Sequence, residues 1–182
     1  MQIHPHFLFN TLNSIAALIA ENPGKAEATV EKLSELFRYT LQSSASTTVK
    51  LSDELDIVRS YLEIEKVRFG DRLEYDMKVD DALLEMPIPG LVIQTLVENS
   101  IKHGIAPQVY GGRILIDARQ SHGKCVITVS DSGRGFGKND GSGFGLKSIR
   151  ERLRLLYGER ARIEILHNDA TQVVMTIPLV MV

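Results

Sequence analysis

Apolar residues recur every third or fourth position near the start of the chain, which is the spacing of one face of a helix. Pro5 suits the first turn of such a helix, because the N–H that proline lacks has no partner there. The first apolar stripe comprises Leu8, Leu12, Ile15 and Ile19. After a break at Asn22-Pro23-Gly24, a second stripe comprises Leu33, Leu36, Phe37, Thr40 and Leu41. This pattern predicts a helical hairpin.

A hairpin of this size cannot bury both of its apolar stripes by itself. We therefore expect it to pair with a second copy in a four-helix bundle, which would make the protein a homodimer. A run of serine and threonine at 43–48 follows the second stripe and indicates a linker. The sequence thus predicts a helical dimerisation domain over residues 1–48 and a second domain over residues 49–182.

The second domain alternates helical and strand-like patterns. Ser52 is expected to cap a third helix whose first turn carries Asp53 and Glu54. The remaining expected elements are a strand at 72–79, a helix from about Leu91 that stops at Gly104, strands at 113–119 and 124–130, a glycine-rich loop at 133–145, a helix to about Tyr157, and strands at 162–166 and 173–177. This order predicts an α/β sandwich, with helices on one face of a mixed sheet, so the whole chain falls in the α+β class.

Composition narrows the possible functions. Lys and Arg number 21 against 23 Asp and Glu, and a net charge of −2 gives no basic surface for direct contact with nucleic acid or anionic lipid. Cys125 is the single cysteine, which excludes a disulfide framework and fits a reducing cytoplasm. No run is long enough for a membrane-spanning helix, so we expect no membrane contact by this chain. A dense motif follows Met1 at once, and we therefore expect a further region upstream.

Four polar segments carry the candidate chemistry. They are Gln2 to Asn10, which contains His6; Glu98-Asn99 with Lys102-His103; Asp131-Ser132-Gly133-Arg134-Gly135; and Gly141 to Leu146. In the second segment, helical spacing predicts Glu98 beside Lys102, and Asn99 beside Lys102 and His103. The amide oxygen of Asn99 is a hard ligand that suits Mg²⁺. A solvated helix face would show the same polar residues.

The third and fourth segments suit a nucleotide. Asp131 presents a carboxylate at a strand end, where Gly133 and Gly135 allow close approach, although a plain Asp-Ser-Gly turn is the alternative. The glycines of the fourth segment precede a helix near Leu146, and backbone amides at a helix N-terminus bind phosphates. These glycines are Gly141, Gly143 and Gly145, and a flexible turn is the alternative. No strand runs straight into them, so a dinucleotide-binding fold is not predicted.

His6 is the candidate phosphoryl acceptor. It lies one residue into the first helix, and a neutral imidazole nitrogen accepts a phosphoryl group near neutral pH. His4 is the rival, but it precedes Pro5 and is pushed away from helical geometry. Asn10 lies one turn after His6 on the same face, where it could contact the ring, place a water for a phosphatase reaction, or serve as a surface amide.

In this order and at these separations, the four segments resemble the LytS/YehU-like family of sensor histidine kinases. The stretch Pro5 to Asn13 is specific to that family, and the later segments match the wider superfamily of gyrase-like, chaperone and mismatch-repair ATPases. The resemblance implies an ATP-binding domain of the Bergerat (GHKL) type that uses ATP and Mg²⁺ to phosphorylate a histidine. It also implies a response regulator receiver domain as partner and a membrane-anchored parent protein.

The same resemblance implies roles for the site residues. Asn99 would hold the metal, Lys102 and His103 would contact the phosphates, and Glu98 would order a water or assist proton removal. Asp131 would accept a hydrogen bond from the amine of adenine, with Gly133 and Gly135 leaving room for the ring. The loop with Gly141, Gly143, Gly145 and Leu146 would close over ATP. The family usually has Asn where His4 stands.

Two other functions stay open from the sequence. One is an ATP hydrolase or serine kinase of the same superfamily, in which Glu98 would activate water or a hydroxyl. The other is a dimerising module that binds nucleotide without transferring phosphate. The sequence does not decide whether transfer would run within one chain or between the two chains of a dimer.

Overall fold

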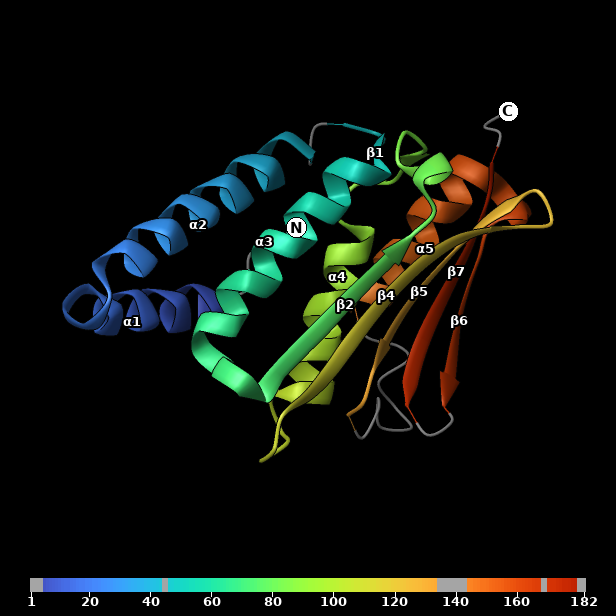
Figure 1. Ribbon diagram of the computed structural model, residues 1–182. Coiled ribbons are helices and arrows are strands. Elements are labelled where there is room, and N and C mark those ends of the chain that lie inside the picture. Colours follow the sequence, from blue (N-terminus) through green and yellow to red (C-terminus); the bar gives the residue numbers. More distant parts are fainter. Residues whose placement is uncertain (1–4, 44–45, 134–143, 168–169, 180–182) are drawn as a thin grey trace.

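The computed structural model describes residues 5–43, 46–133, 144–167 and 170–179, and it consists of a helical hairpin beside a layered α/β unit (Figure 1). The helices are α1 (Pro5–Glu21), α2 (Pro23–Ser43), α3 (Leu51–Phe69), α4 (Val92–Asn99) and α5 (Phe144–Tyr157). The strands are β1 (Val49–Lys50), β2 (Leu73–Val79), β3 (Pro87–Ile88), β4 (Gly112–Ser121), β5 (Lys124–Asp131), β6 (Arg162–His167) and β7 (Thr171–Pro178). The helical N-terminal part and the sheet domain were both predicted and are confirmed.

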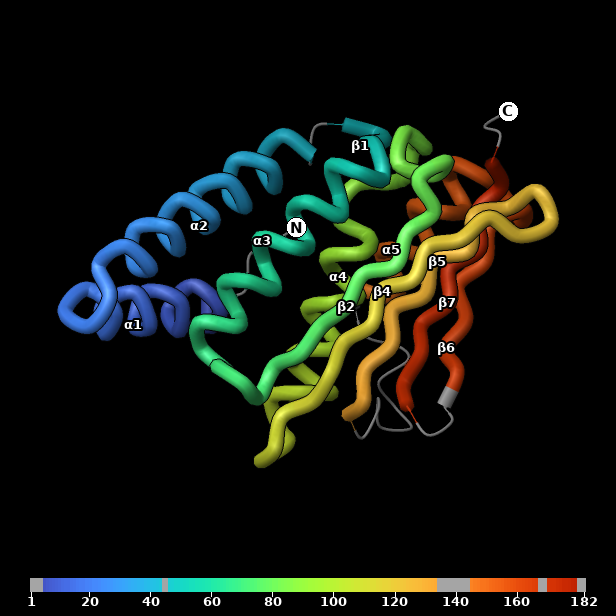
Figure 2. The backbone as a smooth tube through the Cα atoms, in the orientation of Figure 1, coloured from blue at the N-terminus to red at the C-terminus, as the bar shows by residue number. Residues whose placement is uncertain are grey.

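The hairpin packs along α3 through buried faces of both α1 and α2. Phe7 and Ile15 are buried there, and the ring of Phe7 lies 5.1 Å from that of Tyr61 on α3, centroid to centroid. Leu12 and Ile19 of the predicted stripe are 48% and 61% exposed in the single chain. Figure 2 follows the chain from α2 through β1 into α3. Among the described residues, no helix combines the length and the apolar composition needed to cross a bilayer.

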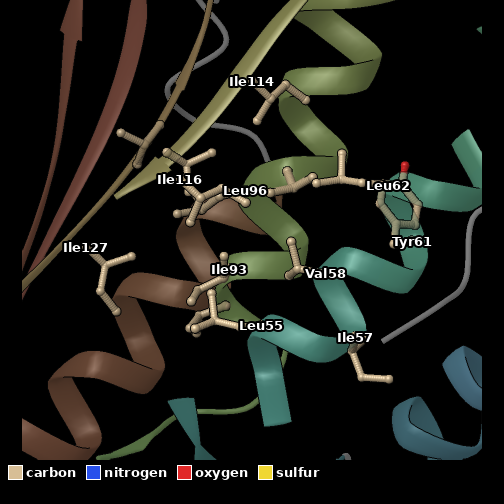
Figure 3. Packing of buried hydrophobic residues seen from close by; sticks show 14 of the residues in the cluster. Leu55, Ile57, Val58, Tyr61, Leu62, Ile93, Leu96, Ile114, Ile116 and Ile127 are labelled. Atoms are coloured by element: carbon tan, nitrogen blue, oxygen red, sulfur yellow. The ribbon is translucent and has the colours of Figure 1, made fainter. Parts of the chain in front are cut away.

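The main sheet has the strand order β2-β4-β5-β7-β6. Strands β2 and β4 are parallel and the other pairs are antiparallel, so the sheet is mixed as predicted. Helices α3, α4 and α5 lie on one face of it (Figure 1). Figure 3 shows the core between these layers, formed by Leu55, Val58 and Leu62 of α3, Ile93 and Leu96 of α4, and Ile114, Ile116 and Ile127 of the sheet. Alternate residues of β4 and β5 point into this core because side chains alternate along a strand.

The start of α3 differs from the prediction. Ser52 was expected as the N-cap, but the helix begins at Leu51 with Lys50 at the N-cap and no side-chain cap. The amide of Leu51 donates to the carbonyl of Met86, and the amide of Ser52 donates to that of Leu84, both at 2.9 Å. Main-chain carbonyls from the region of β3 thus satisfy donors that a helix start otherwise leaves to a capping hydroxyl.

The helix that carries the second polar segment also differs from the prediction. A single helix was expected to stop at Gly104, but α4 ends at Asn99 and continues as a π-helical segment, Ser100–Ile105. π-helical turns are rare and occur frequently at functional sites. The wider turn changes the spacing that an α-helix would impose on Lys102 and His103. The π-helical segment lies between two features described below, the cavity and the end of β5.

Candidate functional site

A buried carboxylate fixes the start of α4. Glu54 on α3 is fully buried, and burial raises its pKa although its hydrogen bonds act in the opposite direction. Its two oxygens accept hydrogen bonds from the amides of Leu91 (2.6 Å), Ile93 (3.0 Å) and Gln94 (3.1 Å), and from the hydroxyl of Tyr39 on α2 (2.9 Å). These amides belong to the helix start, whose donors have no intrahelical acceptor. Glu54 therefore holds α4 against both α3 and the hairpin.

At the other end of α4, a cavity of about 570 Å³ opens between the hairpin and the α/β unit. His6 of α1 lines it together with Glu98 and Asn99 of α4 and Lys102 of the π-helical segment. Helix α3 adds Tyr61, Glu65 and Arg68. The structure thus brings the first predicted segment and the second, about ninety residues apart in sequence, to one cavity of one chain.

His6 is exposed and contacts the next turn of its own helix. The side-chain nitrogen Nδ2 of Asn10 lies 3.1 Å from Nδ1 of His6 and 3.5 Å from Nε2. The contact considered from the spacing of these two residues is therefore present. When this amide donates to Nδ1, the proton of a neutral imidazole sits on Nε2. The role of Asn10 in a phosphatase reaction stays a prediction.

Glu98 is a half-buried carboxyl group on the cavity wall. Burial raises its pKa to about 7, a hydrogen bond from Gln94 lowers it, and the charge of Glu65 raises it further. The side-chain nitrogen of Gln94 lies 3.0 Å from Oε1 of Glu98, one helical turn away. A carboxyl group with a pKa near neutrality suits proton transfer. Gln94 was missed from the sequence, although its spacing of four from Glu98 could have indicated the contact.

A second carboxylate in the cavity was also missed. Glu65 is 3% exposed, and its Oε2 lies 2.7 Å from Nη2 of Arg68, while the hydroxyl of Tyr61 donates to Oε1 at 3.2 Å. Burial raises the pKa of Glu65, whereas the charge of Arg68 and the hydrogen bond from Tyr61 lower it. Spacings of four and three along α3 are the sequence signal for such a cluster, but they do not tell which face of the helix meets the cavity.

Asp131 lies at the end of β5, on the far side of the π-helical segment. It is 3% exposed, burial raises its pKa, and the side chain of Ser100 and the amide of Gly133 donate to it. A Cβ atom added to Gly104 would lie 2.3 Å from Oδ1 of Asp131, and one added to Gly133 would lie 2.3 Å from Cα of Gly104. Only glycine fits at these two positions, so main chain packs closely around the carboxylate.

Several of the remaining predicted residues lie near the cavity or near Asp131. His103 is near enough to Asp131 for its charge to lower the pKa of that carboxyl group. A Cβ added to Gly145 would lie 3.5 Å from Nδ2 of Asn99, so the start of α5 abuts the end of α4. The side chain of Leu146 is 1% exposed and belongs to the core, which leaves its backbone for any ligand contact. The other residues, His4, Gly135, Gly141 and Gly143, lie outside the described residues.

Two protein-family models match this chain. Residues 88–181 match the model described as histidine kinase-, DNA gyrase B-, and HSP90-like ATPase, and residues 1–73 match the model described as histidine kinase. The chain belongs to the histidine kinase-, DNA gyrase B-, and HSP90-like ATPase family.

The narrower resemblance to LytS-like sensor histidine kinases is also confirmed. The chain is 37% identical to the sensor protein LytS of Staphylococcus saprophyticus and 38% identical to the sensor histidine kinase YesM of Bacillus subtilis, over 97% of its own length in both cases. It spans 32% of the length of each of these relatives.

Solved structures support the fold. The catalytic domain of the histidine kinase ThkA aligns with 72% of this chain and 94% of its own, with a TM-score of 0.55 and 17% identity. A blue-light activated histidine kinase from Erythrobacter litoralis aligns with 98% of this chain and 64% of its own, also with a TM-score of 0.55 and 17% identity. The predicted α/β sandwich of the Bergerat (GHKL) type is therefore confirmed.

Proposed function

We propose that this chain is the phosphoacceptor and ATP-binding part of a two-component sensor kinase, and that it moves the γ-phosphate of ATP onto His6. One observation carries the proposal: His6, Glu98, Asn99 and Lys102 line the same cavity within one chain. In phosphoryl transfer the protein mainly positions the two reactants and balances charge. A histidine beside a metal ligand, a cation and a carboxyl group of near-neutral pKa meets those needs.

The proposed ATP site extends from Asp131 to Asn99. A buried carboxylate surrounded by glycine main chain suits a flat ring that carries an amine, so Asp131 would accept a hydrogen bond from adenine. The phosphates would then lie along the π-helical segment toward Lys102 and His103, and backbone amides of the loop with Gly141, Gly143 and Gly145 would be further donors.

Asn99 and Glu98 fit a magnesium ion. Their side chains offer hard oxygen atoms at the cavity wall, and Mg²⁺ bound with a nucleotide usually takes one or two protein oxygens and completes its shell with phosphates and waters. The ion would neutralise charge on the phosphates. Asn99 would hold it directly, and Glu98 would orient a water or receive a proton.

The proposed step needs a proton acceptor. A bond forms between Nε2 of His6 and the γ-phosphorus, and the bond from that phosphorus to the bridging oxygen breaks, so that its electron pair leaves with ADP. Attack by Nε2 uses its lone pair, so the reacting imidazole carries its proton on Nδ1, where the side-chain oxygen of Asn10 would accept a hydrogen bond once the amide turns. The ring must lose this proton as the new bond forms. Glu98, with a pKa of about 7, is suited to accept that proton.

A dimer and a partner domain complete the proposal. Phe9, Leu12 and Ile19 of α1 are 66%, 48% and 61% exposed, which supports pairing with a second copy in a four-helix bundle. A response regulator receiver domain would accept the phosphoryl group on an aspartate, and Asn10 would place a water for the phosphatase reaction. Because the chain spans 32% of its relatives' length, we also propose a longer, membrane-anchored protein with this part in the cytoplasm.

Labelling with γ-³²P ATP and Mg²⁺ tests this function. The protein should acquire label that is stable in base and lost in acid, as a phosphohistidine is. His6→Gln should abolish the label, whereas His4→Gln and the control His122→Gln, on the exposed turn between β4 and β5, should keep it.

Other outcomes would point elsewhere. Release of phosphate without labelled protein would favour an ATP hydrolase, and tight ATP binding with neither label nor release would favour a nucleotide-binding module. Label that persists in His6→Gln but is lost in His4→Gln would move the acceptor to His4.

A further inference from the structure

The cavity beside His6 contains a cation that the proposed function does not use. Among the described residues that line it, the lysine and arginine side chains are Arg68, Arg72 and Lys102. Lys102 belongs to the predicted phosphate site. Nη2 of Arg72 donates to the carbonyl of Gln108 at 2.6 Å, so Arg72 holds the segment that precedes β4. Arg68 instead pairs with Glu65 on its own helix.

Arg68 is held in place before any ligand arrives. Its Nη2 lies 2.7 Å from Oε2 of Glu65, and its guanidinium carbon lies 4.3 Å from the ring centroid of Phe69. Tyr61 in turn donates to the other oxygen of Glu65. The side chain of Arg68 is 25% exposed, whereas that of Glu65 is 3% exposed. A planar guanidinium fixed by stacking and by an ion pair loses little further freedom when it binds an anion.

The charges in the cavity require such a cation. Glu65 and Glu98 both line it, so two carboxyl groups face the space beside His6. A phosphoryl group that passes to His6 would carry its negative charge close to these carboxyl groups. A guanidinium has five N–H donors, so one contact with Glu65 leaves donors for phosphoryl oxygens.

We propose that Arg68 is a further catalytic residue, which donates hydrogen bonds to the γ-phosphoryl oxygens while the group moves from ADP to His6. The inference rests on the proposed function. Glu65 and Phe69 act as positioning residues that aim the guanidinium. Fixed donors at the place where charge is transferred typically contribute about 10²- to 10³-fold in rate. The competing explanation is that Arg68 only neutralises the buried Glu65.

Three variants separate these explanations. Arg68→Gln removes the cation, Glu65→Gln removes its partner, and the double variant removes both and leaves no buried charge unpaired. Arg59→Gln is the matched control, because Arg59 lies on the exposed side of the same helix. For each protein, the initial rate of labelling at saturating ATP, the affinity for ATP and the thermal midpoint are measured.

We expect Arg68→Gln and the double variant to lose about 100-fold or more in labelling rate, with ATP affinity within about threefold of wild type. Glu65→Gln should lose about tenfold or less, because the guanidinium remains. Arg59→Gln should match wild type.

A double variant that labels at the wild-type rate would overturn the inference, since Arg68 would then serve only Glu65. An Arg68→Gln variant that folds and labels like wild type would overturn it as well. These results leave the proposed function intact, whereas a wild-type protein that binds ATP and never labels would refute the function itself. If Arg68→Gln does not fold, the double variant still decides.

Discussion

Glu54 of α3 contacts the first residues of α4, Glu98 lies near the last, and the two carboxyl groups differ in how far their charge is satisfied. Glu54 is fully buried and accepts hydrogen bonds from three amides and a tyrosine hydroxyl. Glu98 is half-buried, accepts a hydrogen bond from Gln94 and faces the like charge of Glu65. A satisfied carboxylate stabilises a structure, whereas an incompletely satisfied one with a pKa of about 7 can exchange a proton. The helix is therefore anchored at one end and reactive at the other.

The largest expected effect is on the reactive end. Glu98→Gln keeps the size of the side chain and removes its ability to accept a proton, so the labelling rate should fall about 10²-fold or more. Initial labelling rates at saturating ATP measure this loss. If Glu98→Gln labelled as fast as wild type, proton transfer to Glu98 would be excluded.

The same variant should not lose stability. The pKa of Glu98 is raised from its ordinary 4.5 to about 7 in the folded chain, so the folded state binds this proton more tightly than the unfolded state does. The contribution of Glu98 to stability therefore falls as the pH rises from about 4.5 through about 7. Glu98→Gln should raise the urea midpoint at pH 8 and change it little at pH 4.

The anchored end should respond in the opposite way. Glu54→Gln leaves backbone donors of α4 facing an amide nitrogen, and each buried unsatisfied donor costs about 1 to 3 kcal/mol. We expect the free energy of unfolding to fall by about 2 to 3 kcal/mol, measured by urea denaturation. Glu85→Gln, at an exposed ion pair with Lys50, is the control and should have almost no effect. A Glu54→Gln variant of unchanged stability would contradict the anchoring role.

A smaller effect concerns pH. If ionised Glu98 accepts the proton, the labelling rate should rise with pH around a midpoint near 7. The charge of Glu65 raises the pKa of Glu98, so Glu65→Gln should move that midpoint to lower pH. His6, Lys102 and Arg68 line the cavity in both proteins, so the difference between the two profiles isolates Glu65. Superimposable profiles would show that the two carboxyl groups are not coupled.

The smallest effect is expected at the hairpin side of the anchor. Tyr39→Phe removes the hydroxyl that donates to Glu54 at 2.9 Å, while the three backbone donors remain. The free energy of unfolding should fall by about 1 kcal/mol, which is ordinary for one hydrogen bond. A loss as large as that of Glu54→Gln would mean that Tyr39, rather than the helix start, is the main partner of the carboxylate.

The anchored end could not be predicted from the sequence, whereas much of the fold could. Periodicity predicted the hairpin, the strands of the main sheet and the sandwich, because an element that buries one face carries apolar residues at regular spacing along its own sequence. The contact of Glu54 with Leu91 spans 37 residues and depends on how two helices pack. The N-cap predicted at Ser52 was wrong for the same reason, because the carbonyls of Leu84 and Met86, which are distant in sequence, accept the hydrogen bonds at the helix start.

The candidate site was predictable as motifs but not as a cavity. The first two segments were recognised separately, and the sequence did not predict that His6 and Asn99 would face one space. The sequence argument assumed that residues three and four apart share a face of an α-helix. His103 lies in a π-helical segment instead, so its neighbours could not be derived in this way. Nothing in the sequence indicated that Tyr61, Glu65 and Arg68 line this space together with His6.

Titration calorimetry with ATP and Mg²⁺ tests most directly whether Asp131 and Asn99 form a nucleotide site. Well-folded protein should bind ATP, and inosine triphosphate, which has no amine for Asp131 to accept from, should bind at least about tenfold more weakly. Absence of heat with both nucleotides, from protein whose unfolding is cooperative, would contradict the assignment of this site.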